Sequence, residues 1–167
     1  GSAEKLKQDW QTGKWQHVLF SFHGLPESQI KRNSGCLESE NCCDRAQACQ
    51  MNCYRAQSLK TADLIAQAAG LTKDQYTICF QSRLGRAKWI GRATTDVAKS
   101  LAESGCKNLL VQTPSFVADC LETLEEIGLE LKEDFIQEGG DNLKLVPCLN
   151  QDSSWVKDFA GLVRAAP

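Results

Sequence analysis

Four short apolar runs, each followed by a helical pattern, constrain the fold of this chain more than any other feature. The runs are rich in β-branched and aromatic residues, as buried strands are, and they occupy residues 17–22, 76–81, 108–113 and 143–147. Helical patterns occupy residues 4–15, 44–70, 93–105, 119–140 and 152–164. Strands that alternate with helices form right-handed crossovers and a parallel sheet. The pattern therefore predicts an α/β fold, with a four-stranded parallel sheet flanked by helices.

The size and charge of the chain bound its class. A length of 167 residues suits one domain over 1–167, without internal repeats or low-complexity linkers. The net charge of -2, with both signs interspersed, gives no reason to expect a nucleic-acid partner. No apolar run approaches the roughly 18–20 residues of a membrane span, and no export signal precedes the first helix. We therefore expect a cytoplasmic protein with reduced thiols and no transmembrane segment.

The segment 34–53, "SGCLESENCCDRAQACQMNC", holds five of the nine cysteines. A disulfide framework is typical of smaller, secreted domains, so a metal site is the better hypothesis. Cys49 and Cys53 are spaced i, i+4 on one face of the expected helix, and Cys42 lies on the same side if the helix begins early. With Cys36 from the preceding loop, four thiolates would enclose an iron–sulfur cluster or one tetrahedral metal ion. The helix N-terminus would also lower the pKa of Cys42 or Cys43.

His23 follows the first predicted strand, at the edge of a parallel sheet where ligands bind. Gly24 and Pro26 come next, so the chain turns sharply there. A histidine in this position can bind a metal or transfer a proton near neutral pH. The alternative is a loop histidine that only caps a neighbouring group.

Three carboxylates, Asp119, Glu122 and Glu126, open the helical pattern after the third strand. Their i, i+3, i+7 spacing places them on one helix face, and the helix dipole stabilises carboxylates at its N-terminus. A solvated acidic face is the usual meaning of such a pattern. This helix, however, begins at the same sheet edge as His23. A histidine that faces carboxylates suits a divalent cation and proton removal.

The motifs "LFSFHGLP", "CFQSRLG" with Trp89 downstream, "PSFVADCLETLEEI" and "LVPCLN" occur in the order and spacing of one known family. From about His17 to Trp155 the chain resembles the carboxy-terminal half of ferrochelatase, a lyase that inserts ferrous iron into a porphyrin in heme synthesis. The resemblance implies a Rossmann-like, chelatase-type half, whose missing amino-terminal half forms the other wall of the porphyrin pocket. It also implies porphyrin and ferrous iron as substrates, and leaves open peripheral contact with the inner membrane.

The resemblance assigns a role to each motif residue. His23 and Glu122 would face each other across the metal-insertion site, with Asp119 and Glu126 continuing a path for protons or metal. Trp89 would pack on the macrocycle, although tryptophan is more often plain core, and Arg83 matches a basic position of the motif. These roles suit the chemistry, because a porphyrin must lose two N–H protons to bases and needs an apolar cleft.

The same resemblance favours a [2Fe–2S] cluster, since several family members carry one. Its expected ligands are Cys36, Cys42, Cys49 and Cys53, with Cys43 as the spare thiol and a structural or sensing role for the cluster. Zinc and unmetallated thiols remain the alternatives at this segment. For the whole chain, the rival hypotheses are a non-enzymatic iron–sulfur or zinc module on the same fold, and a chelatase for another tetrapyrrole, such as a cobalt chelatase.

Overall fold

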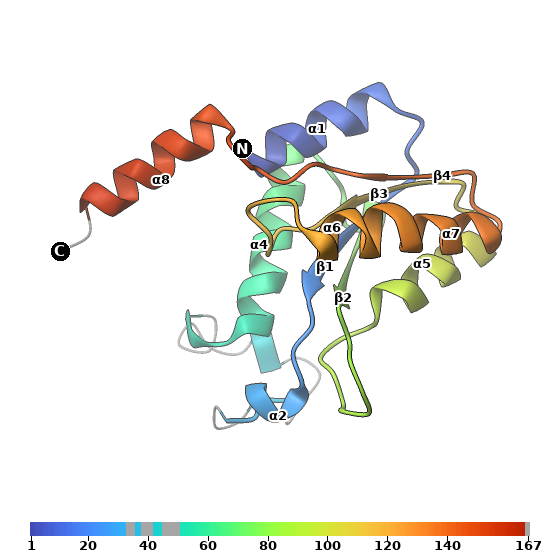
Figure 1. The fold of residues 1–167 in the computed structure, drawn as a ribbon, viewed down its shortest axis with the longest axis horizontal. Coiled ribbons are helices and arrows are strands. Elements are labelled where there is room, and N and C mark those ends of the chain that lie inside the picture. The colour runs from blue at the N-terminus through green and yellow to red at the C-terminus, as the bar shows by residue number, and fades with distance from the viewer. Residues whose placement is uncertain (33–35, 38–41, 45–50, 166–167) are drawn as a thin grey trace.

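The computed structural model describes residues 1–32, 36–37, 42–44 and 51–165 and contains the predicted parallel sheet (Figure 1). Its strands are β1 (His17–His23), β2 (Tyr76–Gln81), β3 (Asn108–Gln112) and β4 (Asn142–Leu145). They lie in the order β2-β1-β3-β4, and every neighbouring pair is parallel. The α/β fold class and the four-stranded parallel sheet are therefore confirmed.

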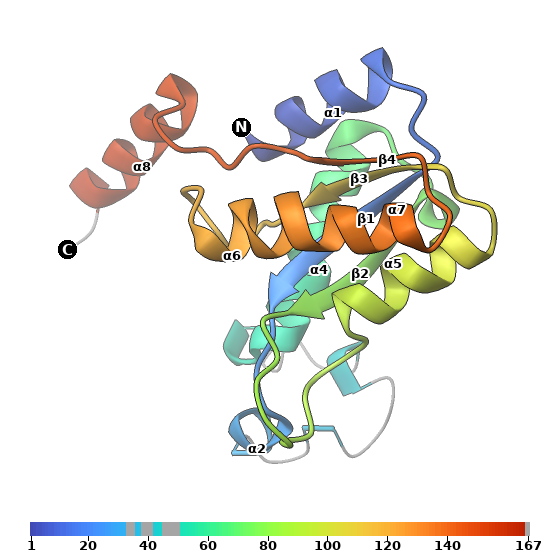
Figure 2. The same ribbon diagram turned by 45° about the vertical axis from the view of Figure 1, so that its right-hand side comes forward.

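Helices cover both faces of the sheet because the central strand β1 is apolar on both sides. Val18, Phe20 and Phe22 of β1 pack into one buried cluster, with residues of the helices α1 (Ser2–Thr12) and α4 (Tyr54–Ala69). Leu19 points to the opposite face and packs with residues of the second helical layer. Figure 2 shows that layer, formed by α5 (Thr94–Glu103), α6 (Leu121–Leu124), the π-helical segment η3 (Glu126–Leu131) and α7 (Lys132–Gln137).

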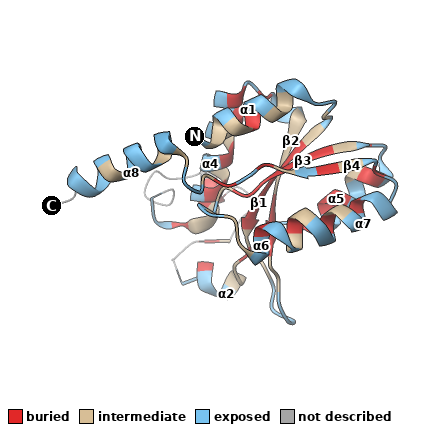
Figure 3. Ribbon diagram, turned by 45° about the horizontal axis from the view of Figure 1, so that its top comes forward, coloured by how far each residue is buried: buried red, intermediate tan, exposed pale blue. Residues whose placement is uncertain are grey.

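Three short elements and one long helix complete the described structure. The short ones are α2 (Glu27–Ile30), η1 (Cys42–Asp44) and η2 (Lys73–Gln75). The helix α8 (Ser153–Ala165) extends away from the sheet and contains no buried residue (Figure 3).

The predicted helix over 44–70 is interrupted at Cys53, although Met51 and Asn52 before it are helical; residues 45–50 lie outside the described residues. Helix α4 begins at Tyr54, and Cys53 before it has an extended backbone, with φ -109° and ψ 116°. The side chain of Cys53 is only 2% exposed, so its burial among apolar residues outweighs the continuation of a helix. Cys53 is therefore not on a helix face, contrary to the prediction, and Cys49, its predicted partner on that face, lies outside the described residues.

The predicted helix over 119–140 begins two residues later and is not uniformly α-helical. Cys120 is the N-cap of α6, so Asp119 precedes the helix and cannot share its face with Glu122 and Glu126. The middle of the helix, from Glu126 to Leu131, is π-helical. π-Helical turns occur frequently at functional sites.

Gly24, directly after His23, offers a test of how tightly the end of β1 is packed. A Cβ atom at this position would lie 2.7 Å from the carbonyl oxygen of Gln81 and 3.1 Å from the Trp89 ring. We expect Gly24→Ala to lower the free energy of unfolding by about 1–3 kcal/mol, because backbone cannot yield to an added methyl group. Chemical denaturation of the two proteins would measure this change in the free energy of unfolding. The control is Gly161→Ala on the exposed helix α8, where nothing lies within 4 Å and alanine favours the helix; equal destabilisation of both variants would contradict the argument.

Candidate active site

His23 lies at the carboxyl end of β1, and three hydrogen bonds fix its position. Its backbone N–H donates to the Ser115 hydroxyl at 3.0 Å, and the Tyr54 hydroxyl donates to its carbonyl at 2.8 Å. Its ring Nδ1 lies 2.7 Å from the carbonyl oxygen of Gly24. A carbonyl can only accept, so Nδ1 carries the proton of the neutral ring. The Nε2 lone pair is then available for a proton or a metal ion.

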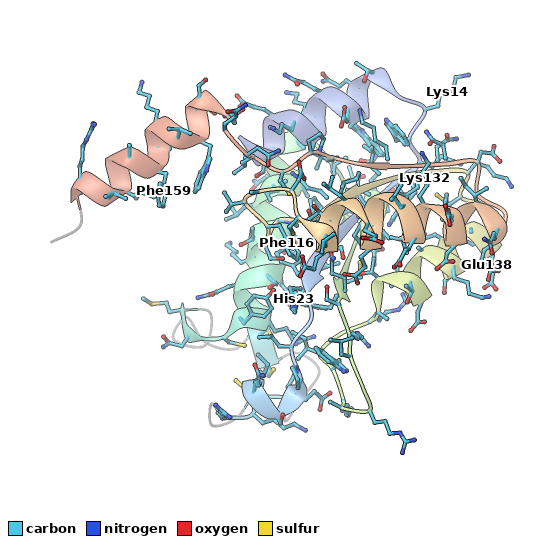
Figure 4. The ribbon with its side chains drawn as sticks, viewed as in Figure 1. Lys14, His23, Phe116, Lys132, Glu138 and Phe159 are labelled. Atoms are coloured by element: carbon cyan, nitrogen blue, oxygen red, sulfur yellow. The ribbon has the colours of Figure 1, made fainter. Side chains whose placement is uncertain are left out.

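The imidazole of His23 is half-buried beside an aromatic ring. The centroids of the His23 and Phe116 rings are 6.2 Å apart, with an angle of 51° between the ring planes (Figure 4). Phe116 belongs to the loop after β3, so the carboxyl ends of two adjacent strands contribute to one site. This agrees with the general position of ligand sites in open parallel sheets.

Glu122 is exposed in the first turn of α6 and remains ionised. The Cys120 side chain lowers the pKa of Glu122, and the helical backbone N–H and the positive charge of protonated His23 lower it further. The loop after β3 contacts His23 through Ser115 and Phe116 and leads into α6, which carries Glu122. That His23 and Glu122 share one site stays a prediction. Their different chemistry, an imidazole with an open nitrogen and an exposed carboxylate, allows proton acceptance and binding of a divalent cation.

Glu126, in contrast, is held by three donors. Its carboxylate accepts from the Ser82 backbone N–H at 2.7 Å, from the Ser82 hydroxyl at 2.6 Å and from the Gln81 amide at 3.2 Å. Ser82 has a φ of 58°, which lets its N–H and its hydroxyl reach the same carboxylate. The Glu126 carboxylate is thus fixed against the end of β2.

Asp119 is also engaged, but with a different part of the chain. Its carboxylate accepts from the Cys148 backbone N–H at 3.1 Å and from the Asn150 amide at 2.7 Å. Partial burial opposes ionisation, yet these hydrogen bonds lower the pKa of Asp119. The three predicted carboxylates therefore do not form one ladder: Asp119 ties the loop before α6 to the segment after β4.

Trp89 and Arg83 belong to the loop between β2 and α5. The partly buried Trp89 pairs with Pro26 in an isolated β-bridge and packs against Gly24, so its ring lies beside the turn that carries His23. Arg83 donates to the carbonyl oxygens of Ile90 and Gly91, at 3.0 and 2.7 Å. In this structure the Arg83 guanidinium closes its own loop.

Sequence reasoning missed four residues that hold the site: Tyr54, Gln81, Ser82 and Ser115. Gln81 and Ser82 stand in the motif "CFQSRLG", directly after a predicted strand, so their position was a usable signal. Ser115 likewise follows the third strand. Tyr54 had no such signal, because it does not follow a predicted strand and its contact with His23 joins residues 31 positions apart.

The described cysteines of the segment 34–53 are all buried in the apolar cluster that contains β1 and α4. These are Cys36, Cys42, Cys43 and Cys53. The Arg55 guanidinium donates to the Cys43 sulfur at 3.0 Å, and the Leu37 N–H donates to the Cys42 sulfur at 3.4 Å.

Burial raises the pKa of Cys43 to about 12, so the predicted lowering by a helix N-terminus is wrong for this thiol. Seven cysteines of the described ranges are free thiols: Cys42, Cys43, Cys53, Cys79, Cys106, Cys120 and Cys148. Within those same ranges, no three His, Cys, Asp or Glu side chains are assembled as a metal site. Cys49, one of the predicted ligands, lies outside the described residues.

Comparison with known proteins decides the family. The model of the family described as Ferrochelatase matches residues 2–166. The chain belongs to the ferrochelatase family. It is 48% identical to the ferrochelatase of Bdellovibrio bacteriovorus over 164 residues, covering 98% of this chain and 49% of that protein. It is 49% identical to the ferrochelatase of Stutzerimonas stutzeri, covering 92% of the chain and 46% of that protein.

The ferrochelatase of Pseudomonas fluorescens (strain Pf0-1) is 48% identical, over 97% of this chain and 48% of its own length. The chain thus spans about half the length of the curated ferrochelatases it matches. No helix in the described part of the chain combines the length and apolar character needed to cross a bilayer.

The tautomer of His23 can be measured directly. We expect neutral His23 to carry its proton on Nδ1, because Nδ1 donates to the Gly24 carbonyl. Nitrogen-15 NMR of the ring, above the pH at which His23 is charged, should show Nδ1 as protonated and Nε2 as a bare, acceptor nitrogen. Detection of the Nε2–H form as the major species would contradict the argument that Nε2 has the available lone pair.

Proposed function

We propose that this chain is the carboxy-terminal domain of a ferrochelatase, which inserts ferrous iron into protoporphyrin to form heme. The observation that carries the proposal is the pair of His23 and Glu122 at the carboxyl edge of the sheet. Nε2 of His23 is the ring nitrogen left over when Nδ1 bonds to Gly24, and Glu122 is an exposed carboxylate in the first turn of α6. The loop that leads into α6 contacts His23 through Ser115 and Phe116. The relatives that carry the name ferrochelatase support the same assignment.

Metal insertion releases two protons, because the porphyrin loses two N–H protons as the cation enters. In the proposed mechanism, Nε2 of His23 accepts a pyrrole proton or binds the incoming iron, and Glu122 assists from the other side. Glu126 and Asp119 would extend the route for protons or metal away from Glu122. Glu126 suits a fixed binding position on that route, because hydrogen bonds from Ser82 and Gln81 hold its carboxylate in place.

Trp89 and Arg83 are the proposed porphyrin-side residues on this half. The packing of Trp89 against Gly24 supports a contact between its ring and a macrocycle bound next to His23. For Arg83 the hydrogen bonds to Ile90 and Gly91 support an indirect role, in which it shapes the loop that carries Trp89.

The second wall of the pocket is proposed to come from an amino-terminal half that packs against α8. This helix has no buried residue and exposes four apolar side chains, Val156, Phe159, Leu162 and Val163, each at least 51% exposed. A single apolar patch of this kind marks an interaction surface. The matched ferrochelatases have a further half of their length available to cover it.

The catalytic roles predict a clear mutational result in the full-length enzyme. We expect His23→Ala and Glu122→Gln each to reduce iron insertion into protoporphyrin by at least about 10²-fold, the scale for loss of a positioned acid–base group. Glu125→Gln is the matched control, because Glu125 is an exposed carboxylate on the same helical segment. Porphyrin fluorescence, which metallation quenches, follows the reaction. Near-normal rates in both site variants would refute the assigned roles.

The same assay can be applied to the isolated chain, without an amino-terminal half. It should fold but show no measurable insertion, since one wall leaves a face of the porphyrin in water and leaves Glu122 solvated. Robust iron insertion by the isolated chain would mean that it pairs with itself. A preference for cobalt and another tetrapyrrole would support the alternative chelatase.

We also propose a [2Fe–2S] cluster in the cysteine segment, with Cys36, Cys42, Cys49 and Cys53 as its ligands. The type of donor and its burial support the proposal, since three of these thiols, Cys36, Cys42 and Cys53, are buried in one apolar cluster with Cys43. In the described residues these thiols are not assembled as a metal site, so a bound cluster would have to draw them together. A bound cluster would supply a rigid cross-link and a redox-responsive centre. The contact of Arg55 with Cys43 supplies positive charge next to the thiols, which favours a negatively charged centre.

The cluster hypothesis has a simple test. Protein purified without oxygen should be red-brown and contain about two irons and two sulfides per chain. Cys53→Ser should abolish the colour, whereas Cys79→Ser, which alters another buried thiol on β2, should not. Colourless protein with one tightly bound zinc ion would contradict the cluster and favour the zinc alternative.

A further inference from the structure

Gln81, the last residue of β2, connects the buried core to the helical segment 121–131. This segment carries Glu122 and Glu126 and is called the acidic helix below. It is 3% exposed, and both ends of its amide are engaged. Its oxygen accepts from the Ser21 hydroxyl at 2.8 Å. Its nitrogen donates to the backbone carbonyl of Glu122 at 2.6 Å and to the Glu126 carboxylate at 3.2 Å. One side chain therefore bonds to both Glu122 and Glu126.

The core side of this connection is rigid. The Ser21 hydroxyl also lies 2.8 Å from the Thr94 hydroxyl, and the two residues are 0% and 2% exposed. Ser21 belongs to β1 and Thr94 is the first residue of α5, so the network joins three elements before it reaches the acidic helix. A fully bonded polar network in a low-dielectric interior specifies one arrangement of its members.

The helix side needs such an anchor. Glu122 lies in the first turn of the helix, where backbone groups have the fewest intrahelical partners, and the α-helical pattern changes to a π-helical one four residues later. The Glu122 residue itself is exposed. In the sheet, Gln81 is the direct partner of His23 in the β1–β2 register. Gln81 thus stands beside one reactive residue and bonds to the backbone of the other.

We propose that Gln81 is a positioning residue for metal insertion, which fixes the Glu122 backbone relative to His23. The proposal rests on the proposed function, and it concerns a side chain that has no ionisable group of its own. Its amide is suited to the task because it accepts from the core and donates to the helix at the same time. Loss of this link should displace Glu122 without removing any reacting group, and small displacements of reacting groups cost large factors in rate.

The test compares Gln81→Leu with Gln112→Leu in the full-length enzyme. Gln112 ends β3 as Gln81 ends β2, it is 5% exposed, and its amide donates to the Ser2 carbonyl and not to the acidic helix. We expect Gln81→Leu to lower kcat for iron insertion by about 10- to 100-fold, with little change in the KM for porphyrin. Gln112→Leu should keep its kcat, because it removes one hydrogen bond to Ser2 and a buried amide oxygen that has no partner among the described residues. The melting temperature of each variant is measured to record its general destabilisation.

A double-mutant cycle separates positioning from general destabilisation. If Gln81 acts through Glu122, the variant with both Gln81→Leu and Glu122→Gln should be no slower than Glu122→Gln alone. Losses that multiply in the double variant, or an equal loss of kcat in Gln112→Leu, would overturn the proposal.

A readout without catalysis distinguishes failure of this inference from failure of the proposed function. Hydrogen exchange of the backbone amides of residues 121–131 should accelerate in Gln81→Leu and not in Gln112→Leu. If the wild-type enzyme inserts no metal, the proposed function fails, and the exchange data still report whether Gln81 holds the helix. Unchanged exchange in Gln81→Leu would overturn the positioning role.

Discussion

The burial of β1 on both faces is the constraint on which the rest of this structure depends. Five consecutive residues, Val18 to Phe22, are buried, so the strand needs a helical layer on each side. Parallel neighbours on both edges of β1 then place the loops after β1, β2 and β3 at one end of the sheet. Ser21 is the only polar residue among the five, and its hydroxyl donates a hydrogen bond to the side-chain oxygen of Gln81.

In the candidate active site, hydrogen bonds hold the backbone of His23 in place, while its Nε2 atom and the Glu122 carboxylate are left available for a ligand. For His23, the N–H, the carbonyl and Nδ1 are all bonded, and Nε2 is the remaining ring nitrogen. Among the carboxylates, Asp119 and Glu126 are held by several donors, whereas Glu122 is exposed. This difference supports Glu122 as the carboxylate that works beside His23. It also explains why the spacing of acidic residues alone could not rank them, because their partners come from distant parts of the chain.

Local patterns were sufficient for the sheet and for most helices. The apolar runs marked all four strands, and Gly70 ends α4 in the left-handed conformation, with φ 81°, as a C-terminal glycine should. The failures lie where non-local packing outweighs local preference. Burial of Cys53 interrupts the expected helix, and the bonds from Ser82 and Gln81 to Glu126 stand at the start of the π-helical segment. Neither effect is visible in the periodicity of the sequence.

The first turn of α4 belongs to both parts of the molecule that carry proposed chemistry. Cys53 is its N-cap, the Tyr54 hydroxyl holds the His23 carbonyl, and Arg55 bonds to Cys43. Of these three consecutive residues, Cys53 belongs to the cysteine segment, Tyr54 contacts the proposed metal-insertion site, and Arg55 contacts the cysteine segment. Cys53 and Tyr54 are adjacent in the chain, so a change that displaces Cys53 should also shift Tyr54. Tyr54 in turn donates a hydrogen bond to the His23 carbonyl. The cysteine segment is therefore not an independent appendage, since its packing and the position of the proposed reactive histidine share one helical turn.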